Sequence, residues 1–410
     1  MGRNRLLSFI PWVFWISACF AVPIWVSTLQ AHWDFDVYAR AAHSLHIGHD
    51  PYMDGIAEQE RLHRDGQPPS DDNVSYSYVY PPVTLPLLRL LGGLPHWGVL
   101  AYWLLYVAAV LAQIWVCMKA GVAQERYFLA LFAPAAAFFP GLAQTATILS
   151  GNIAYILYGM VLLAAYFGWR RGNWYWFYAA VLLTACFKPP YLTLLAIPVL
   201  SARKQWLPAG ITGAAGVCIF AIQPLLWPDY YHHFLRAVAM QFSYNSDFGS
   251  SPAGILGLVL FLEHMPYCSA TWIFYLAYAV PLFALLVYLS RRYFEGTFTF
   301  EQWMPILLCG TILLNPRLIE YDLAPVTVPM ALLVFRHILS SSNRLRHALL
   351  TIVLFIAANY AAYSSFYAAR WTECLVLLAV FSTGSWRLLA QLRESSVVES
   401  ESVEPVEAMA

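Results

Sequence analysis

Long apolar runs are the feature that most constrains how this chain folds. They recur almost without pause from about residue 78 to about residue 389, and many approach the roughly 20 residues that a helix needs to cross a bilayer. Composition agrees, because 60% of the 410 residues are hydrophobic and 11% are charged, against about 25% charged in soluble domains. The sequence therefore predicts an all-α polytopic membrane protein.

Thirteen apolar segments are candidates for these helices, although some are too short to span. The first, Leu6–Leu29, superficially resembles a signal peptide, but it is long enough to span and no small-residue cleavage site follows it. We therefore expect an uncleaved first transmembrane helix. The others are Tyr78–Leu94, Trp97–Met118, Tyr127–Leu149, Ile153–Trp169, Trp174–Leu200, Trp206–Leu226, Pro252–Leu262, Trp272–Leu289, Trp303–Leu314, Leu323–Ile338, Ala348–Tyr367 and Trp371–Leu389.

The charge distribution predicts which helix ends share a side of the membrane, because cytoplasmic loops carry an excess of Lys and Arg. The loop 30–76 carries nine acidic residues against three arginines, so we place it on the non-cytoplasmic face of the membrane. The glutamate-rich stretch 393–410 predicts a disordered cytoplasmic tail, which leaves 1–392 as one transmembrane domain. The clusters assigned to the cytoplasm are Arg3/Arg5, Arg170/Arg171, Arg203/Lys204, Arg291/Arg292, Arg336–Arg346 and Arg387/Arg393.

Two regions do not fit a simple alternation of sides, Tyr78–Met118 and the segment 174–200. Arg171 and Lys204 can share a face only if the segment 174–200 bends back at Lys188-Pro189-Pro190, where the prolines prevent a regular helix. Irregular backbone at membrane depth is tolerated only inside protein or beside a watery cavity. Lys188 then either snorkels toward an interface or offers a cation to an anionic phosphate headgroup, and the sequence leaves both readings open.

Charged side chains near a membrane are costly, so each is a candidate for function. Asp34 and Asp36 follow the first expected helix directly. A carboxylate in that place, backed by an apolar wall, can have a raised pKa and act as a general base. The alternative is a solvated acid that caps an amphipathic helix, whose apolar face would include Val37, Ala41, Ala42 and Leu45.

A second charged stretch, Asn315–Asp322, lies between two late apolar segments. Arg317 can hold a phosphate through two parallel hydrogen bonds, or it can pair with Glu320 and Asp322 inside its own loop. Two other motifs are structural by pattern. Tyr80-Pro81-Pro82 fixes an entry turn, and Ser150-Gly151-Asn152 makes a tight link between two apolar segments.

Several classes of function are not indicated. The net charge of zero gives no reason to expect nucleic acid, and the chain has no Walker A, GxSxG, HExxH or GxGxxG motif. Seven cysteines are scattered singly, and the adjacent His232 and His233 would point about 100° apart on a helix, so neither set predicts a metal site. We expect no metal and no cofactor.

The order of these motifs resembles family 87 of the glycosyltransferases. Asp34-Phe35-x-Val37-Tyr38-x-x-Ala41-Ala42, then Gly48-x-x-Pro51-Tyr52 and Tyr80-Pro81-Pro82, are similar to the opening of that family, and this opening with its spacing is the most specific part. The similarity continues through Gly151-Asn152, Lys188-Pro189 and the stretch 245–254, and ends at Asn315–Asp322. There the chain departs from the family, which commonly shows Ser-Pro-x-Ser-Trp-x-His/Tyr. Asn315 and Arg317 stand in that context, and Tyr321 takes the position often held by histidine.

The resemblance implies a GT-C fold of roughly 11–13 transmembrane helices with a helical first non-cytoplasmic loop. It also implies inverting transfer of a hexose, mannose above all, from a polyprenyl-phosphate carrier to a glycolipid or glycan acceptor. The family's catalytic aspartate falls on Asp34, since the Asp-x-x-Val-Tyr spacing selects it over Asp36. The residues that we expect to contact substrate are Asp36, Tyr38, Tyr80, Asn152, Lys188, Arg317, Glu320, Tyr321 and Asp322.

A transporter or flippase of a lipid-linked sugar is the rival from another class. It predicts an internal repeat with paired broken helices in the two halves. No convincing repeat is visible, and the one large acidic loop lies asymmetrically near the start of the chain. A purely structural membrane subunit explains the charges inside the apolar region least well.

Overall fold

A computed structural model describes residues 32–64, 77–92, 95–121, 150–244, 251–253, 269–364 and 366–401. The regular elements of these ranges are α- and 3-10 helices. In chain order they are α2 (Trp33–His46), α3 (Pro51–Arg64), η1 (Pro82–Thr84), α4 (Leu85–Gly92), α5 (Pro95–Gly121), α8 (Ala154–Arg171), α9 (Tyr175–Phe187), η2 (Pro189–Leu195), α10 (Ala196–Ser201), α11 (Trp206–Ala221), α12 (Gln223–Leu226), α13 (Pro228–Tyr244), α15 (Ser269–Phe294), α16 (Phe300–Leu313), η3 (Glu320–Val326), α17 (Thr327–Leu339), α18 (Arg344–Ser364) and α19 (Phe366–Glu401).

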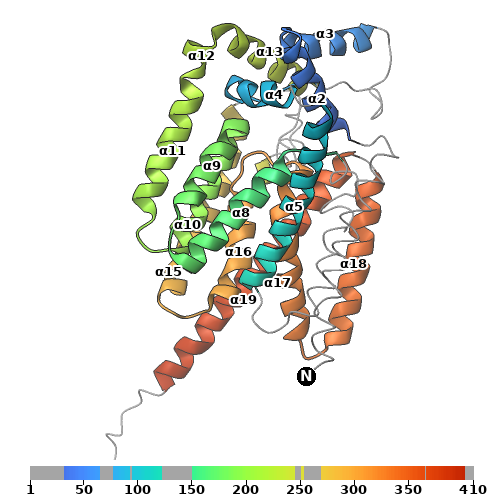
Figure 1. Cartoon of the computed structure of the whole chain (residues 1–410). Helices are drawn as coiled ribbons and strands as arrows, with labels where there is room; N and C mark the ends of the chain where they lie inside the picture. The colour runs from blue at the N-terminus through green and yellow to red at the C-terminus, as the bar shows by residue number, and fades with distance from the viewer. Residues whose placement is uncertain are drawn as a thin grey trace, which may run out of the picture.

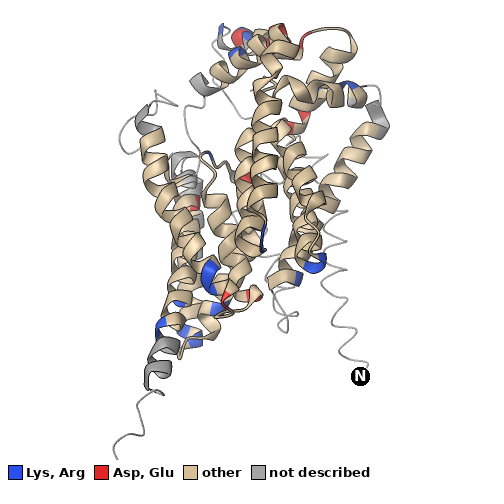
Figure 2. Cartoon of the chain, turned by 90° about the vertical axis from the view of Figure 1, so that its left-hand side faces the viewer, with Lys and Arg blue, Asp and Glu red and all other residues tan. Residues whose placement is uncertain are grey.

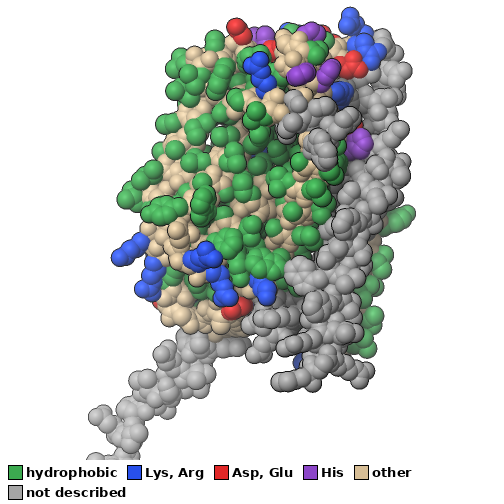
Figure 3. All heavy atoms as spheres, in the orientation of Figure 1, with side chains coloured by type: hydrophobic (Ala, Val, Ile, Leu, Met, Phe, Trp, Pro, Cys, Tyr) green, Lys and Arg blue, Asp and Glu red, His purple; other side chains and the backbone are tan. Residues whose placement is uncertain are grey.

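The long helices run lengthwise as a bundle, and α3, α4, α12 and α13 gather across one end (Figure 1). Hydrophobic side chains cover the middle of the visible surface, with charged and histidine side chains toward its two ends (Figure 3). Such an apolar belt is the surface that lipid requires. In the described part of the chain, five helices are long and apolar enough to cross a membrane: Gly98–Gly121, Trp206–Leu226, Trp272–Phe294, Tyr321–Leu339 and Trp371–Arg393.

The predicted all-α polytopic membrane fold is thus confirmed. The total of 11–13 spans stays a prediction, because the expected segments Leu6–Leu29 and Tyr127–Leu149 lie outside the described residues, as does most of Pro252–Leu262. The expected segment Tyr78–Leu94 forms only η1 and α4. The eight residues of α4 are too few to span.

The basic clusters that the structure describes lie together at one end of the bundle, opposite the end where α3, α4, α12 and α13 gather (Figure 2). Arg336 donates hydrogen bonds to the carbonyl oxygens of Gly121 and Glu301, each at 2.6 Å. Arg387 donates to the carbonyl oxygen of Arg336 at 3.0 Å. Helix ends from distant parts of the chain therefore share this face, as the charge pattern predicts.

The segment 174–200 breaks and turns back at Lys188, as predicted. Helix α9 ends at Phe187, Lys188 is extended with φ −136° and ψ 96°, and two prolines open η2. The Tyr178 hydroxyl near the start of α9 donates to Gln205 Oε1 at 2.9 Å, which places the beginning of this hairpin beside its end. Arg171 and Lys204 can therefore lie on one face without an additional crossing.

The predicted disordered tail does not begin at Arg393, because α19 continues as a helix to Glu401. No proline occurs between Arg393 and Pro405. Once a helix is nucleated, each further residue adds a hydrogen bond at small cost in entropy, so the helix extends past the membrane segment. Residues 402–410 lie outside the described part.

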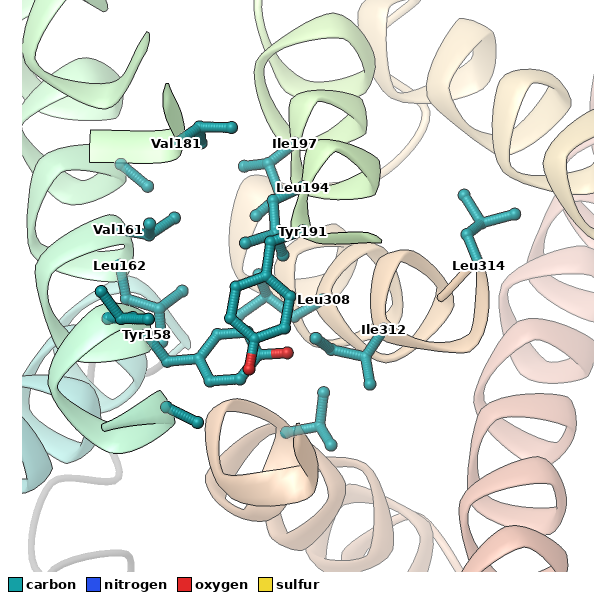
Figure 4. Packing of buried hydrophobic residues seen from close by; sticks show 14 of the residues in the cluster. Tyr158, Val161, Leu162, Val181, Tyr191, Leu194, Ile197, Leu308, Ile312 and Leu314 are labelled. Atoms are coloured by element: carbon teal, nitrogen blue, oxygen red, sulfur yellow. The ribbon is translucent and has the colours of Figure 1, made fainter. Parts of the chain in front are cut away.

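Apolar packing fixes the hairpin against its neighbours (Figure 4). Side chains of α8, η2, α10 and α16 meet in one buried core, and in lipid it is their close van der Waals packing that holds these helices together. Tyr158 of α8 and Tyr191 of η2 are fully buried in it, and their hydroxyl groups come together. Two polar groups are thereby held inside an apolar core, at the break of the hairpin. The other labelled members are Val161, Leu162, Val181, Leu194, Ile197, Leu308, Ile312 and Leu314.

Candidate active site

The turn Ser150-Gly151-Asn152 supports the first turn of α2. The backbone N–H groups of Asp34 and Phe35 both donate to the carbonyl oxygen of Ser150 at 3.1 Å. Gly151 has a φ of +71°, and a Cβ at this position would lie 2.9 Å from the Phe35 side chain. Glycine alone combines that backbone conformation with that close approach. The start of α2 is therefore fixed by a turn more than a hundred residues away in the sequence.

The carboxylate of Asp34 faces the same turn. It accepts hydrogen bonds from the side chains of Ser150 and Asn152. Asn152 Oδ1 accepts from the backbone N–H of Ala154 at 2.9 Å, which directs the amide nitrogen toward the carboxylate. Burial raises the pKa of Asp34 above its ordinary value of 3.8, and the two hydrogen bonds and the charge of Lys188 oppose that rise. A positioned carboxylate with a raised pKa suits a general base.

Asp36 lies in a different environment. Its Oδ1 is 3.0 Å from Nδ1 of His32, and its side chain is 46% exposed. Residues two apart on a helix point about 200° away from each other. The structure therefore separates Asp36 from Asp34, although the sequence nominates both.

Two buried tyrosines join the Asp34 turn to the centre of the molecule. The hydroxyls of Tyr38 and Tyr80 are 2.9 Å apart, and the backbone N–H of Ile153 donates to the Tyr38 oxygen at 3.3 Å. The Tyr52 hydroxyl of α3 donates to the carbonyl oxygen of Tyr80 at 2.7 Å. Burial raises the pKa of Tyr38 well above its usual range, so its hydroxyl stays protonated and neutral.

A second cluster of polar groups is centred on Asp322. Its Oδ1 accepts from the hydroxyls of Tyr191 at 2.5 Å and Tyr158 at 3.2 Å, and lies 3.7 Å from Lys188 Nζ. Its Oδ2 accepts from the backbone N–H of Ile319 at 3.1 Å. The side chains of Asp322 and Lys188 are 3% and 17% exposed. Asp322 thus ties the start of η3 to α8 and to the break of the hairpin.

A cavity of about 270 Å³ opens beside this cluster, and we call it the cation cavity. Lys188 and Arg317 both line it, and Lys188 Nζ lies 3.9 Å from the centre of the Tyr321 ring. Asp322 is the carboxylate in the lining. Two cations and one carboxylate leave a net positive charge, so the cavity favours an anionic ligand.

A second cavity of about 220 Å³ lies on the Asp34 side, between α2, α4 and α5. Tyr38 lines it, together with mainly apolar side chains. Tyr80 and Phe187 line both cavities and form the wall between them. Asp34 also interacts electrostatically with Lys188, so the carboxylate and the cation belong to one electrostatic environment.

Within the ranges that the structure describes, no group of three or more His, Cys, Asp or Glu side chains is arranged to hold a metal ion. Comparison with known proteins then decides the class. The family model described as Glycosyltransferase family 87 matches residues 78–316, more than half of the chain. The chain belongs to glycosyltransferase family 87. No curated protein and no solved structure matches it significantly.

As a glycosyltransferase, the protein takes a sugar donor and an acceptor. Asp34 precedes the matched range, and Arg317, Tyr321 and Asp322 follow it, so their roles rest on the geometry described above. The structure assembles the nominated residues into two neighbouring groups, and of Glu320 it describes the backbone only. The first group is Asp34, Tyr38, Tyr80 and Asn152; the second is Lys188, Arg317, Tyr321 and Asp322.

Sequence reasoning did not nominate some residues of this candidate site. Ser150 stands two positions before Asn152 in a recognised tight link, and Tyr191 ends Lys188-Pro189-Pro190-Tyr191. Both residues belong to motifs that stand out in the sequence, so they could have been nominated. Tyr158 had none, because an aromatic residue inside an apolar helix is typical of a core position.

Proposed function

We propose that this family 87 enzyme transfers a hexose, with mannose as the first candidate, from a polyprenyl-phosphate carrier to a hydroxyl of a glycolipid or glycan. The observation that carries the proposal is the cation cavity, in which Lys188 and Arg317 outweigh Asp322. Only the side chains of Tyr80 and Phe187 separate a phosphate bound there from the cavity that Tyr38 lines, next to the Asp34 turn. A lipid carrier also suits a protein whose visible surface carries an apolar belt (Figure 3).

The proposed chemistry is a single displacement with inversion. Asp34 takes the proton of the acceptor hydroxyl, and the acceptor oxygen forms a bond to the anomeric carbon. The bond between that carbon and the phosphate oxygen breaks, and the electron pair leaves with the polyprenyl phosphate. Negative charge grows on the departing phosphate, so Lys188 and Arg317 stabilise the transition state more than the ground state.

Asp322 has a supporting role in this scheme. Its contact with Lys188 Nζ directs the ammonium group, and its hydrogen bonds from Tyr158 and Tyr191 fix the carboxylate. A cation held in place before the reaction costs no reorganisation when charge develops. Tyr80 lines both cavities, so a sugar held between the base and the cations would lie beside its ring.

We place the reaction on the non-cytoplasmic face of the membrane, and in bacteria that is the periplasmic face of the inner membrane. The described basic clusters lie at the opposite end of the bundle from α2, α3 and α13. Lys and Arg remain on the cytoplasmic side during insertion. The Asp34 end therefore faces outward in this proposal.

The direct test uses vesicles that contain the purified protein, a polyprenyl-phosphate sugar and an extract of membrane glycolipids as acceptor. Wild type should produce a larger glycan and free polyprenyl phosphate, whereas Asp34→Asn should produce neither at a comparable rate. Transfer from a nucleotide sugar, with the lipid donor inert, would show that the proposed donor is wrong. Movement of the intact lipid donor across the bilayer without transfer would favour the transporter.

A further inference from the structure

The cation cavity also has an uncharged polar side chain in its lining. Oε1 of Gln241 is buried and has no hydrogen-bond partner among the residues that the structure describes. The same side chain lines the cavity. A buried amide oxygen without a partner costs about 1–3 kcal/mol of stability. A ligand in the cavity that donates a hydrogen bond to this oxygen would remove that cost.

Helix α13 carries Gln241 to the cavity. Phe234, Val238 and Gln241 are spaced i, i+4 and i+7, which puts them on one helix face, and all three line the cavity. The helix is held to α3 by His233, whose Nδ1 lies 2.7 Å from Asp50 Oδ2. A helix anchored in this way presents the amide from a fixed position.

An aromatic side chain also lines the cavity. Trp272, near the start of α15, lines it as well. An indole ring offers a broad apolar face, which suits the C–H face of a pyranose, while an amide can donate to and accept from its hydroxyls. A lining that holds two cations together with a neutral amide and an indole matches a ligand that has an anionic end and a neutral, hydroxylated end.

We propose that Gln241 is a specificity residue that hydrogen-bonds a hydroxyl of the sugar on the lipid-phosphate donor, with Trp272 as the apolar surface for the ring. This inference rests on the proposed function. The amide oxygen is unpaired without ligand, so a sugar that presents a hydroxyl to it is favoured and an analogue without that hydroxyl is rejected. Lys188 and Arg317 contribute affinity for any prenyl phosphate, and Gln241 contributes preference for the sugar.

The experiment compares two kinds of probe on the full-length protein in detergent. One is farnesyl phosphate, which carries the anion alone, and the other is a panel of mannosyl, glucosyl and galactosyl farnesyl phosphates. Wild type should bind at least one member of the panel more tightly than farnesyl phosphate. Gln241→Leu should weaken binding of that member about 3- to 10-fold, the usual worth of one hydrogen bond, and leave the Kd of farnesyl phosphate unchanged.

The controls separate the possible outcomes. Gln391→Leu makes the same exchange at an exposed glutamine that bonds Gln302 at 3.4 Å on the basic end, and it should change neither Kd. Gln241→Asn keeps the amide and serves if the leucine variant does not fold. Equal weakening of both probes, or no weakening of either, overturns the role of Gln241. Failure of the wild type to bind any of these lipids overturns the proposed donor itself.

Discussion

Asp34 owes its position to backbone contacts rather than to its own charge. Its N–H and that of Phe35 are held by the Ser150 carbonyl, and its carboxylate is met by Ser150 and Asn152 side chains. An asparagine at position 34 can therefore occupy the same place. At position 34, the place of the side chain and its ability to accept a proton are therefore separate properties, and a substitution can remove the second without changing the first.

Asp34→Asn should reduce the rate of transfer by a factor on the order of 10² to 10⁴, because the amide cannot accept the proton of the acceptor hydroxyl. The melting temperature at pH 7 should be unchanged or higher, since burial disfavours the carboxylate that the change removes. Initial rates and melting curves of the purified variants measure both. Asp36→Asn is the matched control, and a dead Asp36 variant beside an active Asp34 variant would move the base to Asp36.

The raised pKa of Asp34 also predicts a pH dependence. The base must be ionised, so the rate should fall as the pH drops through the pKa of Asp34, at a pH above the ordinary value of 3.8. For stability the sign is opposite. A folded-state pKa above the unfolded one means that this group's contribution falls as the pH rises from about 3.8 through the folded-state pKa.

Two measurements test this dependence. The first is the rate at saturating donor as a function of pH, and a rate that stays flat down to about 3.8 would contradict the assignment. The second is the difference in melting temperature between wild type and Asp34→Asn across the same range. That difference should grow in favour of the variant as the pH rises.

Among the elements, the loop from Asn315 to the start of η3 combines two separable functions. Asp322 is a structural anchor, since it takes hydrogen bonds from Tyr158 and Tyr191 and lies beside Lys188. Arg317 lines the cation cavity from the same loop. The sequence left open whether Arg317 pairs with Glu320 and Asp322, and the structure shows that Lys188 of the hairpin lies 3.7 Å from the Asp322 carboxylate.

This division predicts different losses from neighbouring positions. Asp322→Ala should lower the free energy of unfolding by about 3–5 kcal/mol, because it leaves the buried Lys188 ammonium without its carboxylate. Arg317→Ala should weaken binding of farnesyl phosphate, since Arg317 lines the cation cavity, and the phosphate-binding role predicts little change in stability. Chemical unfolding and lipid titration of both variants measure the contrast. Lost stability in Arg317→Ala with normal lipid binding would make Arg317 structural.

At the scale of the whole molecule, charge and hydrophobicity agree on one orientation. The apolar belt lies between a basic end and an end built from short, more polar helices (Figures 2 and 3). The basic last turns of α8, α15 and α17 therefore lie toward the same side. The candidate active site lies toward the other side, where α2 and α13 meet the bundle.

Labelling of single cysteines in intact cells can test this orientation. In a variant without the seven native cysteines, Arg61→Cys on α3 should react with a membrane-impermeant maleimide. Arg291→Cys, in the last turn of α15, should react only after the cells are opened. The expected contrast follows from the basic clusters remaining in the cytoplasm. The reverse pattern would place Asp34 on the cytoplasmic side.

Much of the architecture was predictable because its causes are local in the chain. Apolar run length predicts helices in lipid, and prolines after Lys188 predict a break wherever the chain lies. The amphipathic pattern of α2 predicts that Val37, Ala41 and Ala42 are buried, and they are. Counting Lys and Arg along the sequence is enough to predict which helix ends lie on the same side of the membrane.

The sequence by itself thus determined the fold class, the break at Lys188 and the set of charged candidates. Only the tertiary structure decided their pairing, because a contact between distant residues depends on how the helices pack. Asp322 and Tyr191 are 131 positions apart, yet they share a hydrogen bond. Gln241 looks like an ordinary helix residue until α13 is docked beside the cation cavity. Burial, and with it the need for a partner, is a property of the packed molecule and not of a residue in the chain.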